Sequence, residues 1–126
     1  MIVAGLGFRA HATTAALRAA LDAAQNAAPA GCNITALAVF AEKADSPALQ
    51  ALARDTNLTL HALTRDQIAQ TPTPTQSPRI QTLFATGSLA EALALTAAGP
   101  GARLITPRHT SPDGTATAAL AESLTP

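Results

Sequence analysis

One run of small residues, Gly5–Ala10, could bind an anion. It follows an apolar, strand-like segment, comes before a predicted helix, and carries Arg9 with His11 just beyond it. Backbone N–H groups and the positive end of a helix gather where a strand gives way to a helix, which suits a carboxylate or phosphate. The pattern therefore predicts a turn in which Gly5 and Gly7 bring the backbone close to an anionic ligand.

The same run satisfies the G-x-G-x-x-G/A pattern of dinucleotide-binding turns. That pattern also expects an acidic residue about 20 positions further on to hold a ribose hydroxyl. The nearest acid at a second strand end is Glu42, which is too distant. A general anion site, or a turn that only packs a helix against the sheet, is favoured over a nucleotide site, and no cofactor is expected.

A second small-residue turn lies at Thr86, Gly87 and Ser88, again before a predicted helix. It too could present backbone N–H groups to an anion. Ser88 and Glu91, however, have the spacing of a capping box, in which each side chain accepts the other residue's backbone N–H. Both interpretations of this turn stay open.

Catalytic and metal-binding patterns are weak. Ser88, either His11 or His109, and Asp113 could form a hydrolytic triad, but no serine is surrounded by G-x-S-x-G or another nucleophile elbow. Ser88 and His109 remain the only catalytic candidates. No two of the three histidines stand four residues apart with an acid between them, so no metal site is predicted. These histidines are His11, His61 and His109.

Two further residues have ordinary structural explanations. Cys32 is the only cysteine, which leaves no intrachain disulfide and favours a buried, inert thiol in a reducing compartment. Lys43 is the only lysine and forms a polar cluster with Glu42 and Asp45 just past a predicted strand. Most such clusters are solvated surface, but Lys43 is kept as a candidate ligand-binding cation.

Composition restricts the class of protein. The 126 residues suit one domain with a single core, which we expect to span residues 1–126. Eight basic and eight acidic residues cancel, and no basic run gives the electrostatic footprint of a nucleic-acid-binding protein. No apolar stretch is long enough to cross a bilayer. We expect a cytoplasmic protein that binds neither nucleic acid nor membrane.

Strand-like and helix-like segments alternate along the chain. Ser46 before Pro47 indicates a helix start, and Thr64–Gln67 has the spacing of a capping box. Such alternation predicts an α/β domain with three layers, α/β/α, around a mostly parallel or mixed central sheet. The expected strands are Met1–Leu6, Ile34–Phe40, Leu58–Leu63, Ile80–Ala85 and Arg103–Thr106. Helices are expected over Thr13–Ala28, Pro47–Asn57 and Ser88–Thr96. A loop is expected over Thr71–Pro78, and a turn at Ser111–Gly114 comes before a last segment from Thr115.

Four segments resemble the CobE and CbiG C-terminal family of cobalamin biosynthesis proteins. Val3–Arg9 is similar to the family's glycine-x-glycine-x-arginine start, although cysteine commonly stands there at the place of Phe8. The other segments are Ala38–Lys43 followed by Pro47 and Leu49, then Thr86–Leu95, and finally Ala102–Ala121 with Pro107, Arg108, Ser111, Pro112, Asp113, Gly114 and Thr117. The resemblance covers essentially the whole chain.

The resemblance implies a role in building the corrin ring, with a precorrin or corrinoid as ligand and other cobalamin-pathway enzymes as candidate protein partners. A precorrin is a flat polycarboxylate, and helix N-termini beside arginines suit carboxylates. We expect Gly5–Arg9 and Gly87–Ser88 to converge on one groove. The candidate donors are Arg9, His11, Lys43, Arg108 and His109. Hydrolysis of a precorrin lactone or acyl group is the alternative function.

Overall fold

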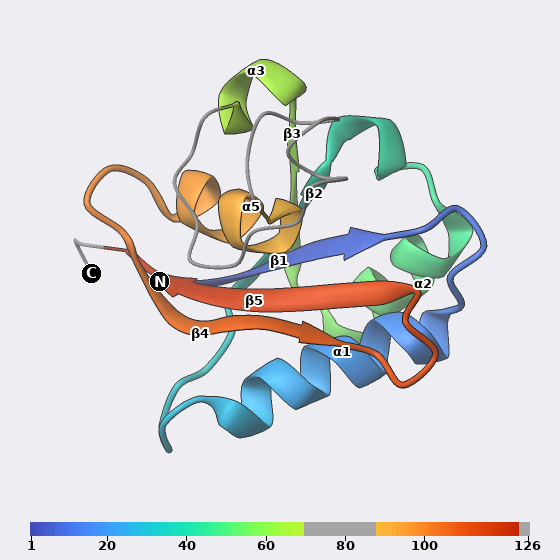
Figure 1. Cartoon of the computed structure of the whole chain (residues 1–126), viewed down its shortest axis with the longest axis horizontal. Coiled ribbons are helices and arrows are strands. Elements are labelled where there is room, and N and C mark those ends of the chain that lie inside the picture. The colour runs from blue at the N-terminus through green and yellow to red at the C-terminus, as the bar shows by residue number, and fades with distance from the viewer. Residues whose placement is uncertain (70–87, 124–126) are drawn as a thin grey trace.

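A mixed sheet of five strands lies at the centre of the computed structural model, which describes residues 1–69 and 88–123 (Figure 1). The strand order is β3-β2-β1-β5-β4. Strands β1, β2 and β3 are parallel to one another, whereas β5 runs antiparallel to both of its neighbours. The strands are β1 (Ile2–Phe8), β2 (Ala36–Phe40), β3 (Thr59–Leu63), β4 (Arg103–Thr110) and β5 (Ala116–Glu122).

Helices cover both faces of this sheet. Helices α1 and α2 pack on one face, and α5 with the short α3 packs on the other (Figure 1). The predicted α/β/α arrangement with a mixed sheet is therefore confirmed. The helices are α1 (Thr14–Ala27), the 3-10 turn η1 (Ala41–Lys43), α2 (Pro47–Thr56), α3 (Arg65–Ile68) and α5 (Leu89–Ala98).

The helix starts predicted from capping residues are found in the structure. The hydroxyl of Thr13 accepts the backbone N–H of Ala16 at 3.1 Å and caps α1. Ser46 caps α2, and Thr64 with Gln67 forms the complete capping box of α3. These local hydrogen bonds satisfy N–H groups that have no partner inside the helix.

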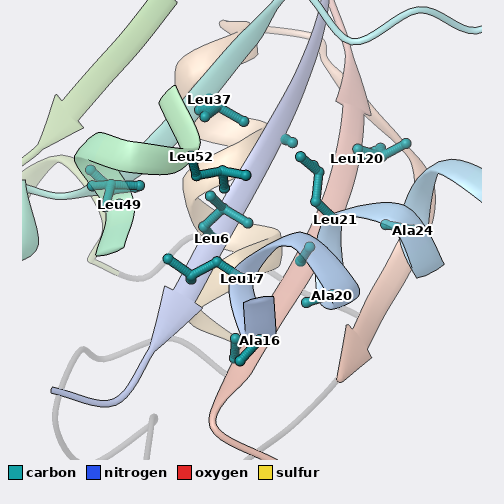
Figure 2. Packing of buried hydrophobic residues seen from close by; sticks show 14 residues of the cluster. Leu6, Ala16, Leu17, Ala20, Leu21, Ala24, Leu37, Leu49, Leu52 and Leu120 are labelled. Carbon is teal, nitrogen blue, oxygen red and sulfur yellow. The ribbon is translucent and has the colours of Figure 1, made fainter. Parts of the chain in front are cut away.

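Leucine and alanine fill the core on the α1 face of the sheet. Leu6 and Leu120 project from the sheet, and Leu17 from α1 and Leu52 from α2 pack against them (Figure 2). All four are at most 1% exposed. This packing fixes α1 and α2, and with them the loops that follow β1 and β2.

The other face is covered by α5, whose Leu93 is fully buried against Val3 and Ala121 of the sheet. Ile68 of α3 belongs to the same buried cluster. Because the residues of α5 that face the sheet are mostly alanine, the helix lies close to the strands. This close approach leaves no room for a side chain at Gly5 of β1.

The last two strands form a hairpin that extends beyond the predicted segments. The strand predicted over Arg103–Thr106 continues to Thr110, and the predicted turn at Ser111–Gly114 is present. The segment after Thr115 is strand β5, which inserts between β1 and β4. Two register shifts interrupt the pairing of β4 with β5.

Two predicted segments, the loop over Thr71–Pro78 and the strand over Ile80–Ala85, lie outside the described residues. Within residues 1–69 and 88–123, no helix is both long and apolar enough to span a bilayer.

Candidate functional site

The parallel strands end at one edge of the sheet, and most of the candidate residues gather there. Phe8 and Phe40 are the last residues of neighbouring parallel strands, and the β4–β5 turn lies beside them because Phe8 pairs with Ala116. We call this the carboxyl edge and define it as residues 9–12, 41–46, 64–67 and 107–115. Of these, residues 107–109 lie within β4, level with Gly5 and Leu6 of β1, and so a few residues short of the strand ends. Open α/β sheets usually bind ligands beyond the carboxyl ends of their strands.

Gly5 and Gly7 lie inside strand β1, which corrects the predicted turn. Gly5 pairs with Ala38 on one side and Ala119 on the other. A Cβ on Gly5 would overlap the carbonyl oxygen of Ala90 and lie 2.7 Å from the nitrogen of Ala94, so glycine is required for α5 to approach the strand. The dinucleotide interpretation needed these glycines in the turn before a helix, and the structure does not provide that arrangement.

The N-terminus of α5 lies over the end of β1. A Cβ on Gly7 would lie 3.6 Å from the Cβ of Leu89, the first residue of the helix. Ser88 and β1 are therefore near one another, as the groove hypothesis requires. Gly87 and Thr86, the rest of that predicted turn, lie outside the described residues.

Ser88 and Glu91 are both fully buried. The Ser88 hydroxyl accepts the backbone N–H of Glu91 at 3.4 Å, which is the Ser88 half of the predicted capping box. The Glu91 carboxylate also reaches strand β4, where its Oε2 accepts the backbone N–H of Arg108 at 2.8 Å. Capping-box spacing did not anticipate this bond, which joins α5 to an irregular part of β4. The positive end of α5 thus already has a carboxylate from its own first turn.

Among the described residues, the candidate cations of the carboxyl edge have no carboxylate partner, and neither does Arg54 of α2, whereas two other arginines are paired. Arg18 lies 3.9 Å from Asp55, and Arg103 lies 3.7 Å from Glu122. By contrast, within the described part of the chain, no carboxylate lies within salt-bridge distance of the candidate cations of the edge, which are Arg9, Lys43 and Arg108.

Neighbouring strands set the positions of these three cations. The backbone N–H of Arg9 donates to the carbonyl of Thr115 at 2.9 Å, so the chain just after β1 is fixed to the hairpin. Lys43 ends η1, and its ammonium lies 5.6 Å from the ring centroid of Phe8. Arg108 comes from β4 and is half-buried. His11, also a candidate, is exposed in the loop between β1 and α1.

The triad that could be assembled from the sequence does not form among the described residues. His109 Nδ1 lies 2.9 Å from the carbonyl oxygen of Pro107. Asp113 accepts hydrogen bonds from the Ser111 hydroxyl and from Thr115, and these bonds lower the pKa of its carboxyl below the usual 3.8. No hydrogen bond in residues 88–123 links either group to Ser88.

The remaining candidates lie away from the carboxyl edge. His61 is exposed in the middle of the edge strand β3, opposite Ala38. Cys32 is half-buried beside the C-terminal end of α1, where its carbonyl accepts the Gln25 side chain at 2.7 Å. Over the described ranges, no three His, Cys, Asp or Glu side chains are grouped so that they could hold a metal ion.

Two residues of this region were missed as site candidates. Phe8 was interpreted only as a departure from a family pattern, because the predicted strand ended at Leu6 and gave no sign that Phe8 is the last residue of β1. Glu91 was explained by its spacing from Ser88, and nothing local predicts its bond to Arg108, because the two residues are 17 positions apart.

Comparisons with known proteins give one consistent result. The family model described as "Cobalamin synthesis G C-terminus" matches residues 2–121. A solved structure of CobE, a protein from the cobalamin (vitamin B12) biosynthetic pathway, is 28% identical with a TM-score of 0.85, over 99% of this chain and 95% of that one.

A second solved structure, the cobalamin biosynthesis protein chiG from Agrobacterium tumefaciens str. C58, is 31% identical with a TM-score of 0.75, over 98% of this chain and 99% of that one. No curated protein matches the sequence significantly. The comparisons thus agree with the resemblance carried by the sequence motifs.

Proposed function

From the premise that this chain belongs to the cobalamin synthesis G C-terminus family and is a protein of cobalamin biosynthesis, we propose that it binds a precorrin or corrinoid polycarboxylate at the carboxyl edge of its sheet. In this role it holds a pathway intermediate and assists its processing. The observation that carries the proposal is the set of cations at the edge, Arg9, Lys43 and Arg108, that lack a carboxylate partner in the described residues.

The spacing of these cations supports a broad, flat ligand. Lys43 follows β2, Arg9 follows β1 and Arg108 lies in β4, so they span three inter-strand steps. At about 4.8 Å a step, the strands that carry them are spread over roughly 14 Å, while the Lys43 ammonium itself reaches toward β1, where it lies 5.6 Å from the Phe8 ring centroid. That width suits a tetrapyrrole with acidic groups around its rim, since each cation can form a charge-assisted hydrogen bond with a separate carboxylate.

The first turn of α5 has a supporting role in this proposal. Ser88 is buried and its hydroxyl is engaged as a cap, while Glu91 supplies a carboxylate at the helix end. Arg9 and His11, which are exposed, and Lys43 and Arg108, which are half-buried, are therefore better placed than Ser88 to meet the ligand directly. Gly5 contributes by allowing α5 to pack close to β1.

Hydrolysis of a lactone or acyl group has less support. A serine nucleophile must reach its substrate and transfer its proton to a base. Ser88 is 0% exposed, and in the described residues neither His109 nor Asp113 is hydrogen-bonded to it. Time-dependent release of an acyl fragment from a precorrin, abolished by His109→Ala, would establish this alternative in place of binding.

The test uses two corrinoids that differ chiefly in peripheral charge. Dicyanocobyrinic acid carries free peripheral carboxylates, dicyanocobinamide carries amides, and the cyanide ligands of both prevent axial coordination by histidine. We expect the purified protein to change the visible spectrum of the acid at low salt and to bind the amide at least tenfold more weakly. Each ion pair between a cation of the protein and a carboxylate of the acid should weaken as the salt concentration rises, because exposed charges are screened.

Variants then identify the surface that binds. Arg9→Gln, Lys43→Gln and Arg108→Gln should each lower affinity for the acid about tenfold, the usual scale of a lost charge-assisted bond. Arg54→Gln, on the exposed last turn of α2, removes the same charge away from the carboxyl edge and serves as the control. Equal binding of acid and amide, or equal loss in the Arg54 variant, would contradict the proposal.

A further inference from the structure

The two phenylalanines in the described residues, Phe8 and Phe40, are each the last residue of a strand at the carboxyl edge. A cationic side chain lies over each ring. The ammonium of Lys43 lies 5.6 Å from the ring centroid of Phe8, and the guanidinium of Arg65 lies 5.6 Å from that of Phe40. Phe8 packs against the core on the α1 face, whereas Phe40 belongs to the core on the α5 face. The two aromatic residues therefore place cations on opposite sides of one sheet edge.

The pair of Phe8 and Lys43 is the more informative because of its surroundings. Phe8 is half-buried, so its ring is held by the core while part of it faces outward. Lys43 is the only lysine of the chain, and its position in η1 follows from the parallel pairing of β1 with β2. Within the described residues, Lys43 forms no ion pair.

A cation over the face of an aromatic ring is attracted by the ring quadrupole. Lysine has a long, flexible side chain, and a contact that restricts it before binding lowers the entropy lost when a ligand is captured. Leucine or methionine at position 8 could fill the same apolar space but would offer no aromatic face. The aromatic character of Phe8 therefore contributes something that core packing alone does not require.

We propose that Phe8 is a positioning residue that holds the Lys43 ammonium at the carboxyl edge, ready to pair with one peripheral carboxylate of the corrinoid. This inference rests on the proposed function, since it assigns Lys43 to a particular ligand group. It adds a device to that function, which is an aromatic support that orders a cation in the free protein.

The first measurement concerns the free protein and needs no ligand. Reductive methylation with ¹³C-formaldehyde labels the single lysine and the N-terminal amine, which differ in their NMR shifts. Because ring currents shift nuclei above an aromatic face upfield, we expect the dimethyl-Lys43 signal to be displaced upfield from that of an unfolded control. Phe8→Leu should abolish the displacement, and Phe8→Tyr should keep it.

The second measurement is a double-mutant cycle with dicyanocobyrinic acid. Phe8→Leu should weaken binding two- to fivefold, the scale of an exposed cation–π contact, and Phe8→Tyr should restore it. In the Lys43→Gln background, Phe8→Leu should change affinity less than twofold, because the residue through which Phe8 acts is gone. A purely structural role would weaken binding equally in both backgrounds. Phe8→Met is the second apolar replacement if the leucine variant does not fold.

The outcomes separate this inference from the function on which it rests. If the unmodified protein does not bind the acid, the proposed function and the inference both fail. If it binds and Phe8→Leu binds equally well, or if no upfield displacement is seen in the free protein, only the positioning role of Phe8 is overturned. A loss that persists in the Lys43→Gln background also overturns it.

Discussion

Replacing Gly5 by alanine should separate helix α5 from strand β1. The added Cβ would lie 2.7 Å from the nitrogen of Ala94, which is 0.7 Å closer than the 3.4 Å at which ordinary van der Waals contact begins, and its overlap with the oxygen of Ala90 is more severe. Both atoms belong to the backbone, so no rotamer change can relieve the contact. The helix must move, and Leu93 loses part of its packing on the sheet.

The cost can be estimated from that displacement. A gap of 0.5–1 Å forfeits about a quarter to a half of the dispersion energy between the atoms that it separates, and overpacking a core commonly costs about 1–3 kcal/mol. Since the obstruction is backbone, we expect a loss near the upper end, about 3 kcal/mol. For a chain of 126 residues, this corresponds to a fall in Tm of roughly 10 °C.

Gly7→Ala provides the matched control on the same strand. Its Cβ would lie 3.0 Å from the Thr117 hydroxyl, a side-chain atom that can adjust, and 3.6 Å from Leu89, which is ordinary van der Waals contact. Urea unfolding of both variants should show a loss for Gly7→Ala of less than about 1 kcal/mol. A Gly5→Ala variant within 1 kcal/mol of the natural protein would refute the close packing of α5 on β1.

Three further predictions concern polar groups around β4. Glu91→Leu should cost about 1–3 kcal/mol by leaving the N–H of Arg108 without its acceptor, whereas Glu91→Gln, which keeps an acceptor oxygen, should lose less in the same urea assay. The lowered pKa of Asp113 means that its contribution to stability is present above the unfolded value of 3.8 and is lost as pH falls through the lower folded value. The difference in unfolding free energy between the natural protein and Asp113→Asn should therefore shrink between pH 5 and pH 2. Thr106→Val should stabilise the protein by about 1 kcal/mol, because the buried Thr106 hydroxyl has no hydrogen-bond partner among residues 1–69 and 88–123. A loss of stability would show that this hydroxyl is satisfied.

Local sequence signals predicted the helices well because their causes are local. A serine or threonine side chain that accepts the backbone N–H three residues later stabilises the start of a helix, as at Thr13 and Ser46. The turn at Ser111–Gly114 likewise depends on side chains that bond to their own segment, through Asp113. For these features, no knowledge of the tertiary structure was needed.

The glycines of β1 could not be interpreted correctly from local sequence signals. A G-x-G pattern after an apolar run is typical of a turn, and the apolar run alone did not reveal that the strand continues to Phe8. Gly5 is a glycine because helix α5, more than 80 residues later in the chain, crosses it at backbone distance. Spacing within the motif carries no information about that helix.

The sequence by itself determined the α/β class, the helix starts and the family, because periodicity, capping and motif similarity can each be read over short stretches of chain. Only the tertiary structure decided the strand order, with β5 inserted between β1 and β4. That order brings Arg9, Lys43 and Arg108 to one edge, sets Phe8 beneath Lys43, and directs Glu91 to β4. Each of these contacts joins distant segments, and the strand pairing that creates them depends on the packing of the whole sheet.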